Sequence, residues 1–284
     1  MTAFHRNTVT FSEVLMLTNA QIKEIKKLNE KSKARREAGL FVIEGPKMFS
    51  EAPVDWVEKI YVTQEFLEEI DREYVSESAS STTISQMIQW MDHEIVTREQ
   101  MAKISDTQTP QGILCVLRQP SYSMDDLLCK GNDERSSLYM VLEDIQDPGN
   151  LGTIFRTAEG AGVKGIIMSR QTVDIFNPKT IRSTMGSIYR VPFIYTDSIA
   201  SAIAMLKAKD VSVYAAHLKG ECYHDEVKYG DTAFLIGNEG NGLKDDTATL
   251  ADSYIKIPMR GQLESLNAAV ASAILMYEFD RQNR

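Results

Sequence analysis

The sequence has few cysteines and no long apolar run. Three cysteines, Cys115, Cys129 and Cys222, occur in 284 residues without CxxC spacing, which excludes a disulfide scaffold and a zinc knuckle. The longest apolar run, 268–277, is too short to cross a bilayer. Because unpaired thiols are typical of a reducing compartment, we expect a cytoplasmic protein without a membrane partner.

Basic residues are also scarce. The 31 Lys and Arg are outnumbered by 40 Asp and Glu, and the resulting formal charge of −9 repels polyanions from the chain as a whole. The segment 21–36 departs from this balance with seven basic and two acidic residues, whereas 37–137 holds eight basic and 19 acidic residues. The spacing of Ile22, Ile25 and Leu28 predicts a helix whose lysines face outward. This face is either merely solvated or a phosphate-binding patch.

Composition shifts along the chain predict two domains. Short apolar runs alternate with amphipathic stretches over 37–117, which indicates a small α/β module and a first domain over 1–118. Segment 119–137 gathers Pro, Ser, Asp, Asn and Gly and is interpreted as a linker. Over 138–284, strand-like and helix-like runs alternate, which predicts an α/β fold with a parallel sheet covered on both faces. The strand-like runs are 138–142, 165–168, 191–195, 211–215, 232–236 and 254–257.

Ligands of an open parallel sheet bind beyond the carboxyl ends of its strands, so the residues there are inspected first. The first such segment is 143–152. We expect Pro148 and Gly149 to form a turn, Asn150 to cap the following helix, and Arg156 to lie about two turns into it. An arginine on a helix surface is ordinarily just a solvated charge.

The second segment follows the run 232–236 and holds three glycines within six residues, Gly237, Gly240 and Gly242. Their GxxGxG spacing, with no Lys-Ser/Thr after it, supports neither a dinucleotide fingerprint nor a phosphate-binding P-loop. Glu239 places a carboxylate inside this turn, where loops commonly contact ligands.

The third segment joins the run 254–257 to a helix of small residues. Ser265 and Asn267 stand at the predicted helix start, where capping alone accounts for one of them. The alanines that follow make a slim helix against which another backbone can pack closely.

In this order and spacing the three segments resemble the motifs of the SpoU (TrmH-type) branch of the SPOUT methyltransferases. The matching stretches are Asn150-Leu-Gly-Thr-Ile-Phe-Arg156-Thr-Ala, Ile236-Gly-Asn-Glu239-Gly-Asn-Gly-Leu and Ile257-Pro-Met-Arg-Gly-Gln-Leu-Glu-Ser265-Leu-Asn267. The resemblance covers the chain from about Ser136 onward. Ala268-Ala-Val stands where many relatives have Val-Ser-Val, which leaves the polar positions intact. Segments 33–46 and 107–112 are similar to the L30e-like substrate-binding module often fused to this family.

The resemblance implies a sheet with a deep trefoil knot and transfer of a methyl group from S-adenosylmethionine to a ribose 2′-hydroxyl of RNA. It favours ribosomal RNA over tRNA, because the fused module is typical of the rRNA-modifying members. It also implies a homodimer in which Arg156 is contributed across the interface. No metal is expected to take part.

The resemblance also assigns residues. The cofactor is expected to contact mainly backbone of Gly237, Ile257 and Leu266, with Ile236 and Met259 beside them. Arg156 matches the catalytic arginine, but a guanidinium with a pKa above about 12 accepts protons poorly. We therefore expect Arg156 to bind the adjacent phosphate and stabilise charge on the 2′-oxygen. The other catalytic candidates, expected to orient the ribose and the loops, are Asn150, Glu239, Ser265 and Asn267, and the candidate RNA-binding residues are Lys31, Lys33, Arg35 and Arg36.

Four alternatives stay open or are disfavoured by particular residues. A tRNA 2′-O-methyltransferase stays open, whereas a catalytically silent RNA-binding protein of the same fold is disfavoured by the intact Arg156, Glu239, Ser265 and Asn267. A Rossmann-type oxidoreductase is disfavoured because 143–152 lacks three glycines in the fingerprint spacing. His217, Cys222 and His224 form only a partial metal cluster, with no fourth ligand nearby in the sequence.

Overall fold

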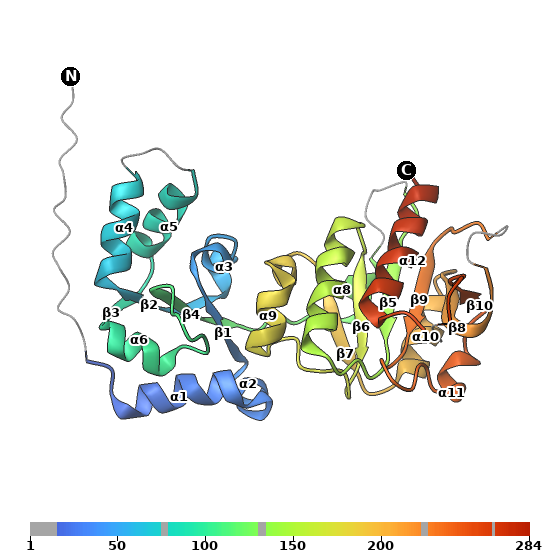
Figure 1. The fold of residues 1–284 in the computed structure, drawn as a ribbon, viewed down its shortest axis with the longest axis horizontal. Coiled ribbons are helices and arrows are strands. Elements are labelled where there is room, and N and C mark those ends of the chain that lie inside the picture. Colours follow the sequence, from blue (N-terminus) through green and yellow to red (C-terminus); the bar gives the residue numbers. More distant parts are fainter. Residues whose placement is uncertain (1–15, 75–78, 130–134, 223–226, 263–264) are drawn as a thin grey trace, which may run out of the picture. The chain divides into compact units, whose positions relative to one another are not determined.

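The computed structural model describes residues 16–74, 79–129, 135–222, 227–262 and 265–284. The chain divides into two compact units, Met1–Gln119 and Pro120–Arg284, each of which is described by itself (Figure 1). Within the described ranges, no helix is both long enough and apolar enough to cross a membrane.

The first unit is an α/β module built on four strands. The strand order is β1-β4-β2-β3, in which β4 pairs antiparallel with β1 and β2, and β3 pairs parallel with β2. The strands are β1 (Leu40–Glu44), β2 (Val57–Thr63), β3 (His93–Val96) and β4 (Ile113–Arg118). The helices are α1 (Asn19–Glu30), α2 (Ser32–Ala38), α3 (Pro46–Ser50), α4 (Gln64–Tyr74), α5 (Ala79–Trp90) and α6 (Arg98–Ile104), with a 3-10 turn at Val54–Trp56.

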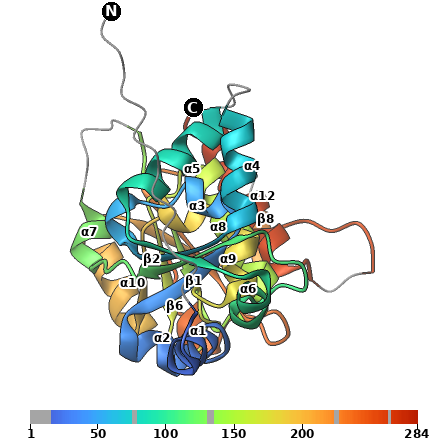
Figure 2. The ribbon, with the colours of Figure 1, turned by 90° about the vertical axis from the view of Figure 1, so that its left-hand side faces the viewer.

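Helices cover both faces of this small sheet, with α1 and α6 on the opposite side from α4 and α5 (Figure 2). Ile25 and Leu28 of α1 and Ile104 of α6 pack in one core with alternate strand residues such as Val42 and Val116. Capping boxes start both helices, with Thr18 before α1 and Thr97 before α6. The predicted outward face of α1 is confirmed, because its lysines are exposed while its apolar stripe is covered.

Arg35, one of the predicted RNA-binding residues, is buried with 2% of its surface exposed. Its Nη1 donates hydrogen bonds to the carbonyls of Leu28 at 2.6 Å and Asn29 at 3.0 Å. Carbonyls in the last turn of a helix have no intrahelical donor, and the guanidinium satisfies two of them at the end of α1. The structure therefore contradicts a place for Arg35 on an RNA-facing surface and gives it a structural role between α1 and α2.

The second unit is built on a six-stranded sheet in which all strand pairs are parallel, in the order β10-β8-β9-β5-β6-β7. This confirms the predicted parallel α/β architecture. The strands are β5 (Leu138–Leu142), β6 (Gly165–Ser169), β7 (Phe193–Thr196), β8 (Ser212–Cys222), β9 (Thr232–Ile236) and β10 (Ser253–Lys256). The helices are α7 (Met124–Leu128), α8 (Pro148–Gly160), α9 (Pro178–Thr184), α10 (Ile199–Lys207), α11 (Asp245–Ala248) and α12 (Ala268–Gln282), with a 3-10 turn at Ser187–Tyr189.

Both faces of the central strands are buried, as a parallel sheet requires. Val141 and Leu235 share one core with residues of α7 and α10, while the intervening strand residues face the opposite side. On that opposite side α8 and α12 pack against each other (Figure 1).

The segment 119–137, which sequence composition assigns to a linker, contains helix α7. A capping box starts this helix, because Ser123 and Asp126 exchange hydrogen bonds between side chain and backbone. Leu127 and Leu128 are buried in the core that α10 also covers. This part of the segment is therefore packed into the second unit.

The order in which the chain adds strands to the sheet reverses at β5. From β5 the chain adds β6 and then β7 on one side. The later strands β8, β9 and β10 lie on the other side, with β9 next to β5. Such a switch opens a crevice beyond the carboxyl ends of the two strands. Two of the three candidate segments, 143–152 and 237–243, follow β5 and β9 and therefore meet at this point.

Candidate active site

The loop between β5 and α8 starts the helix earlier than the sequence analysis expects. Asp147 is the N-cap of α8, its Oδ1 accepts a hydrogen bond from the Asn150 backbone N–H at 2.8 Å, and Pro148 occupies the first helical position. The prediction that Asn150 caps this helix is wrong. Because Asp147 does the capping, the side chain of Asn150 is available to other groups.

Asn150 joins the three segments through its side chain. Its Nδ2 donates to Oε1 of Glu239 at 3.0 Å, and its Oδ1 accepts from Nδ2 of Asn267 at 2.9 Å. Asn267 also caps α12, where its Oδ1 accepts from the backbone N–H groups of Ala269 and Val270. A continuous hydrogen-bonded chain therefore runs from Glu239 through Asn150 to the start of α12.

Glu239 is held by three donors. Besides Asn150, the backbone N–H groups of Gln146 and Asp147 each donate to its carboxylate at 3.0 Å. Burial by itself would raise the pKa of Glu239, but these hydrogen bonds outweigh it and the pKa lies below its usual value. Glu239 is thus ionised at neutral pH and poorly suited to accept a proton. Its hydrogen bonds instead hold the side chain of Asn150 and the backbone of Gln146 and Asp147 in place.

The loop after β9 folds back tightly on itself. Asn238 and Gly242 pair as an isolated bridge, with backbone N–H to carbonyl distances of 3.0 and 2.9 Å. A Cβ on Gly237 would lie 2.1 Å from backbone atoms of Gly242 and Leu243, and Gly242 has a φ of +71°. The glycines are needed for this close approach and this conformation.

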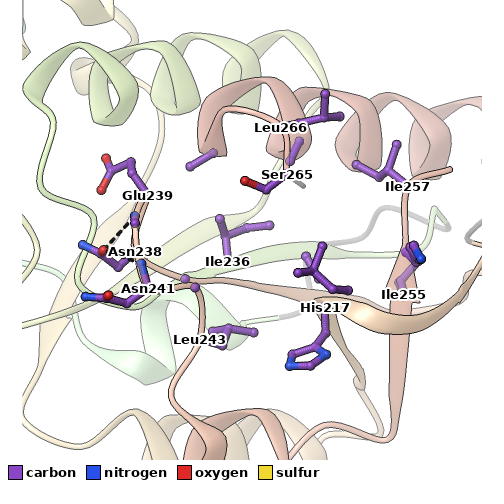
Figure 3. A pocket seen from close by; sticks show the side chains of 18 of the residues that line it. His217, Ile236, Asn238, Glu239, Asn241, Leu243, Ile255, Ile257, Ser265 and Leu266 are labelled. Carbon is purple, nitrogen blue, oxygen red and sulfur yellow. Dashed lines mark hydrogen bonds between the residues drawn. The ribbon is translucent and has the colours of Figure 1, made fainter. Parts of the chain in front are cut away.

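A cavity of about 290 Å³ lies between this loop, the end of β10 and the start of α12 (Figure 3). Its volume is close to the lower end of small-molecule sites, about 300 Å³. Apolar side chains line much of it, and His217 and Lys256 add polar groups from β8 and β10. All five predicted cofactor contacts line this cavity, namely Ile236, Gly237, Ile257, Met259 and Leu266.

A second, more open basin of about 730 Å³ adjoins the cavity. Asn150, Asn267 and Gln146 line the basin, and Glu239, Ser265 and Leu266 line both the basin and the cavity. The structure thus brings together four of the predicted catalytic residues around the basin, and two of them, Glu239 and Ser265, also line the cavity.

Arg156, the fifth predicted catalytic residue, lines neither compartment of this chain. It is exposed on α8, six residues after Asn150, which corresponds to a rise of about 9 Å along the helix. Among the described residues, no ion pair or hydrogen bond involves its guanidinium.

Two segments of the first unit that are similar to the L30e-like module lie against each other. Glu44, at the end of β1, accepts hydrogen bonds from Ser105 Oγ at 2.7 Å and Thr107 Oγ1 at 2.6 Å. The next residue, Gly45, donates its backbone N–H to the carbonyl of Ile113 at 3.0 Å. These bonds fix the turn after β1 to the loop that precedes β4.

The described part of the chain contains no group of three or more His, Cys, Asp or Glu side chains that could hold a metal ion. His224, part of the partial cluster considered above, lies outside the described residues, as do Leu263 and Glu264 of the third motif.

Three residues that shape the site are not among the predicted ones. Asp147 caps α8, Gln146 supplies a backbone donor to Glu239, and Asn238 donates its Nδ2 to the carbonyl of Asp144 at 2.8 Å. The dipeptide Asp147-Pro148 could have revealed the cap, because an acidic N-cap followed by proline is a common helix start. Nothing in the sequence pattern marks Gln146 or Asn238.

Comparisons with known proteins agree with this geometry. The model of the SpoU rRNA Methylase family matches residues 137–277, and the MRM3-like substrate binding domain matches residues 19–115. The chain is 31% identical over 260 residues to the 23S rRNA (guanosine(2553)-2′-O)-methyltransferase RlmP of Bacillus subtilis, covering 91% of this chain and 95% of that protein. It is 31% identical over 192 residues to the 23S rRNA (guanosine-2′-O-)-methyltransferase RlmB of Bordetella pertussis, covering 66% of this chain and 78% of that protein. The crystal structure of the AdoMet-bound rRNA methyltransferase from Sinorhizobium meliloti superposes with a TM-score of 0.77 at 29% identity, covering 94% of this chain and 97% of that one. The chain therefore belongs to the SpoU rRNA methylase family.

Proposed function

We propose that this protein transfers a methyl group from S-adenosylmethionine to a ribose 2′-hydroxyl of ribosomal RNA. The observation that carries the proposal is the pair of adjoining compartments that share Glu239, Ser265 and Leu266. An apolar cavity suits the cofactor, and a polar basin suits a ribose. The relatives named as 23S rRNA 2′-O-methyltransferases and the AdoMet-bound neighbour support the same reaction and substrate.

The residues that line the cavity fit S-adenosylmethionine, a ligand without phosphates. Ile236, Ile257 and Leu266 offer apolar surface. Because Gly237 has no Cβ, the backbone of Gly237, Gly242 and Leu243 packs tightly together along the cavity wall. When bound, the cofactor supplies an electrophilic methyl group on a sulfonium. The protein must hold the attacking oxygen in line with that group. Because the cavity meets the basin at Ser265 and Glu239, the oxygen would be held there.

Side chains of this protein orient the ribose and stabilise the charge that develops on its oxygen. Asn150 and Asn267, fixed by Glu239, orient the ribose in the basin. Arg156 binds the neighbouring phosphate and stabilises negative charge on the 2′-oxygen, and the hydroxyl proton leaves to water or phosphate. Glu239 keeps its charge throughout, since its lowered pKa makes it a weak base.

We place this protein in the cytoplasm and assign separate roles to the parts of its chain. Residues 1–118 bind RNA, and 138–284 form the knotted methyltransferase domain, into which α7 of the segment 119–137 is packed. Arg156 acts across the interface of a homodimer, which would bring its exposed guanidinium to the partner's basin. Val270 and Tyr277 on α12 are 49% and 46% exposed and support an interface on this helix.

A map of ribose methylation tests the proposed function. We expect one or more 2′-O-methyl groups in rRNA to disappear from cells that lack the protein and to return with the wild-type gene. Calorimetric titration should detect binding of S-adenosylmethionine and none of NAD. Loss of a tRNA mark instead would favour the tRNA alternative. An unchanged map with no cofactor binding would overturn the proposal in favour of a silent RNA-binding protein.

The basic surface of α1 and α2 gives a separate prediction. Lys31, Lys33 and Arg36 are exposed, and Lys33 pairs only loosely with Glu37 at 3.8 Å. Changing these three residues to Glu should weaken RNA binding by at least about tenfold and flatten its dependence on salt, because each phosphate contact releases counterions. Filter binding across a salt series measures both effects.

A variant at Arg35 distinguishes the loss of surface charge from damage to the fold. Arg35→Met should lower the melting temperature, because it leaves the carbonyls of Leu28 and Asn29 without their donor. The triple exchange at the exposed positions should keep the wild-type melting temperature and cofactor affinity. Unchanged RNA binding in the triple variant would remove this surface from the proposal.

A further inference from the structure

The glycine loop that walls the cavity is fastened to the loop after β5 by an ion pair. Lys244, directly after Leu243, places its Nζ 2.7 Å from Oδ2 of Asp144. Oδ1 of Asp144 accepts a hydrogen bond from Ser169 Oγ at 2.7 Å, and the Asp144 backbone N–H donates back to that hydroxyl at 2.9 Å. Asp144 is thus held from β6 while it holds Lys244.

Asp144 contacts both ends of the glycine loop. Its carboxylate binds Lys244 at the end of the loop, and its carbonyl accepts from Asn238 Nδ2 near the beginning at 2.8 Å. Its φ of +58° lies in the left-handed region, which Asp and Asn tolerate better than most residues. The backbone of Asp144 therefore adopts an uncommon conformation at the point where the two loops meet.

The loop segment between these two contacts forms a wall of the cavity. Gly240, Gly242 and Leu243 line it, whereas Lys244 itself does not. Leu243 is also buried in the core beneath, so its position depends on how the loop ends. A shift of the Lys244 backbone would be transmitted directly to the cavity wall.

The backbone at Lys244 has a second anchor in Glu143, whose Oε1 also lies 3.8 Å from the Lys244 Nζ. Glu143 is buried and accepts from the Lys244 backbone N–H at 2.9 Å and from Thr247 Oγ1 at 2.6 Å. The side chain of Lys244 is 61% exposed and that of Asp144 is 19% exposed, and an ion pair whose ammonium remains in contact with solvent contributes little to global stability. Removing the ammonium should therefore leave the fold intact while loosening the end of the loop.

We propose that Lys244 and Asp144 are positioning residues, whose ion pair holds the glycine loop in the conformation that binds S-adenosylmethionine. This inference rests on the proposed function of the same site. The pair contacts neither compartment directly and acts through Leu243 and Asn238. Its effect is to reduce the loop ordering that the cofactor would otherwise have to impose on binding.

Cofactor titration of Lys244 variants tests the proposal. Lys244→Met should raise the Kd for S-adenosylmethionine about tenfold, the consequence of a loop that must be ordered on binding. Lys244→Arg should restore affinity to within about threefold of wild type, because it keeps a cation opposite Asp144. Asp144→Asn, which suits the same φ, should match Lys244→Met. In turnover assays the KM for the cofactor should rise while kcat changes little.

Lys209→Met is the matched control. It removes an exposed charge from the turn before β8, at the amino ends of the strands, whereas the cavity lies at their carboxyl ends, and it should bind the cofactor like wild type. If wild-type protein binds the cofactor and Lys244→Met binds it equally well, the positioning role is overturned. If wild-type protein itself fails to bind, the proposed function fails first. A fall in kcat with an unchanged KM would also contradict the proposal.

Discussion

Replacing Arg156 with lysine is expected to lower kcat for methyl transfer about 100-fold, the effect of losing one donor to developing negative charge. Lysine keeps the positive charge but loses the planar fork that binds a phosphate through two parallel hydrogen bonds. Arg156 is exposed and lies outside both compartments of its own chain. The Kd for S-adenosylmethionine should therefore stay at the wild-type value.

Single-turnover transfer of a labelled methyl group to rRNA measures this effect, and calorimetry measures cofactor binding in parallel. Arg284→Lys serves as the control, because Arg284 is an exposed arginine just beyond the carboxyl end of α12, paired with Asp280. Near-normal turnover in Arg156→Lys would mean that charge alone suffices, and the phosphate-binding role would have to be abandoned.

The second large effect is expected at Gly237. In Gly237→Ala the new Cβ would lie 2.1 Å from the backbone carbon of Gly242 and the backbone nitrogen of Leu243. Neither atom can move aside without opening the Asn238–Gly242 bridge and displacing the cavity wall. Overpacking of this kind costs about 1–3 kcal/mol, and we expect the Kd for S-adenosylmethionine to rise about 10- to 100-fold.

Equilibrium dialysis with labelled cofactor suits so weak a complex. Gly230→Ala is the control, since no atom lies within 4 Å of the Cβ that it would add. Melting curves without cofactor should show a lower melting temperature for Gly237→Ala, because the overpacking cost falls on the folded protein, and an unchanged one for Gly230→Ala. Wild-type affinity in Gly237→Ala would show that the loop accommodates a side chain and that the cavity does not depend on its tight turn.

The predicted sheet of the second unit is confirmed because its strands are buried on both faces and therefore appear as short apolar runs. Two strand regions do not show such an apolar run in the sequence. β3 contains His93 and Glu94, which are only half-buried. Beyond Ala215, β8 continues into a stretch with Lys219 and Gly220, whose pairing with β10 resumes only after a register shift. Long-range pairing decides such segments, and a local pattern does not contain it.

The candidate site was predictable in its positions and less so in its contacts. Glu239, Ser265 and Asn267 all lie where the motifs place them, beside the expected cavity or basin. The contact of Asn150 with Glu239 spans 89 residues, and no spacing rule predicts it. Arg35 fails for a different reason, because arginine is usually exposed and its burial becomes visible only when the end of α1 is in place.

The chain of hydrogen bonds from Glu239 through Asn150 to Asn267 sets an order of events during protein synthesis. Its middle member precedes the other two by 89 and 117 residues, so the basin cannot close until the start of α12 has left the ribosome. The first unit, complete by Gln119, can fold well before then, since domains generally fold as units from the N-terminal side. A nascent chain would therefore acquire a folded first unit before it can bind the methyl donor.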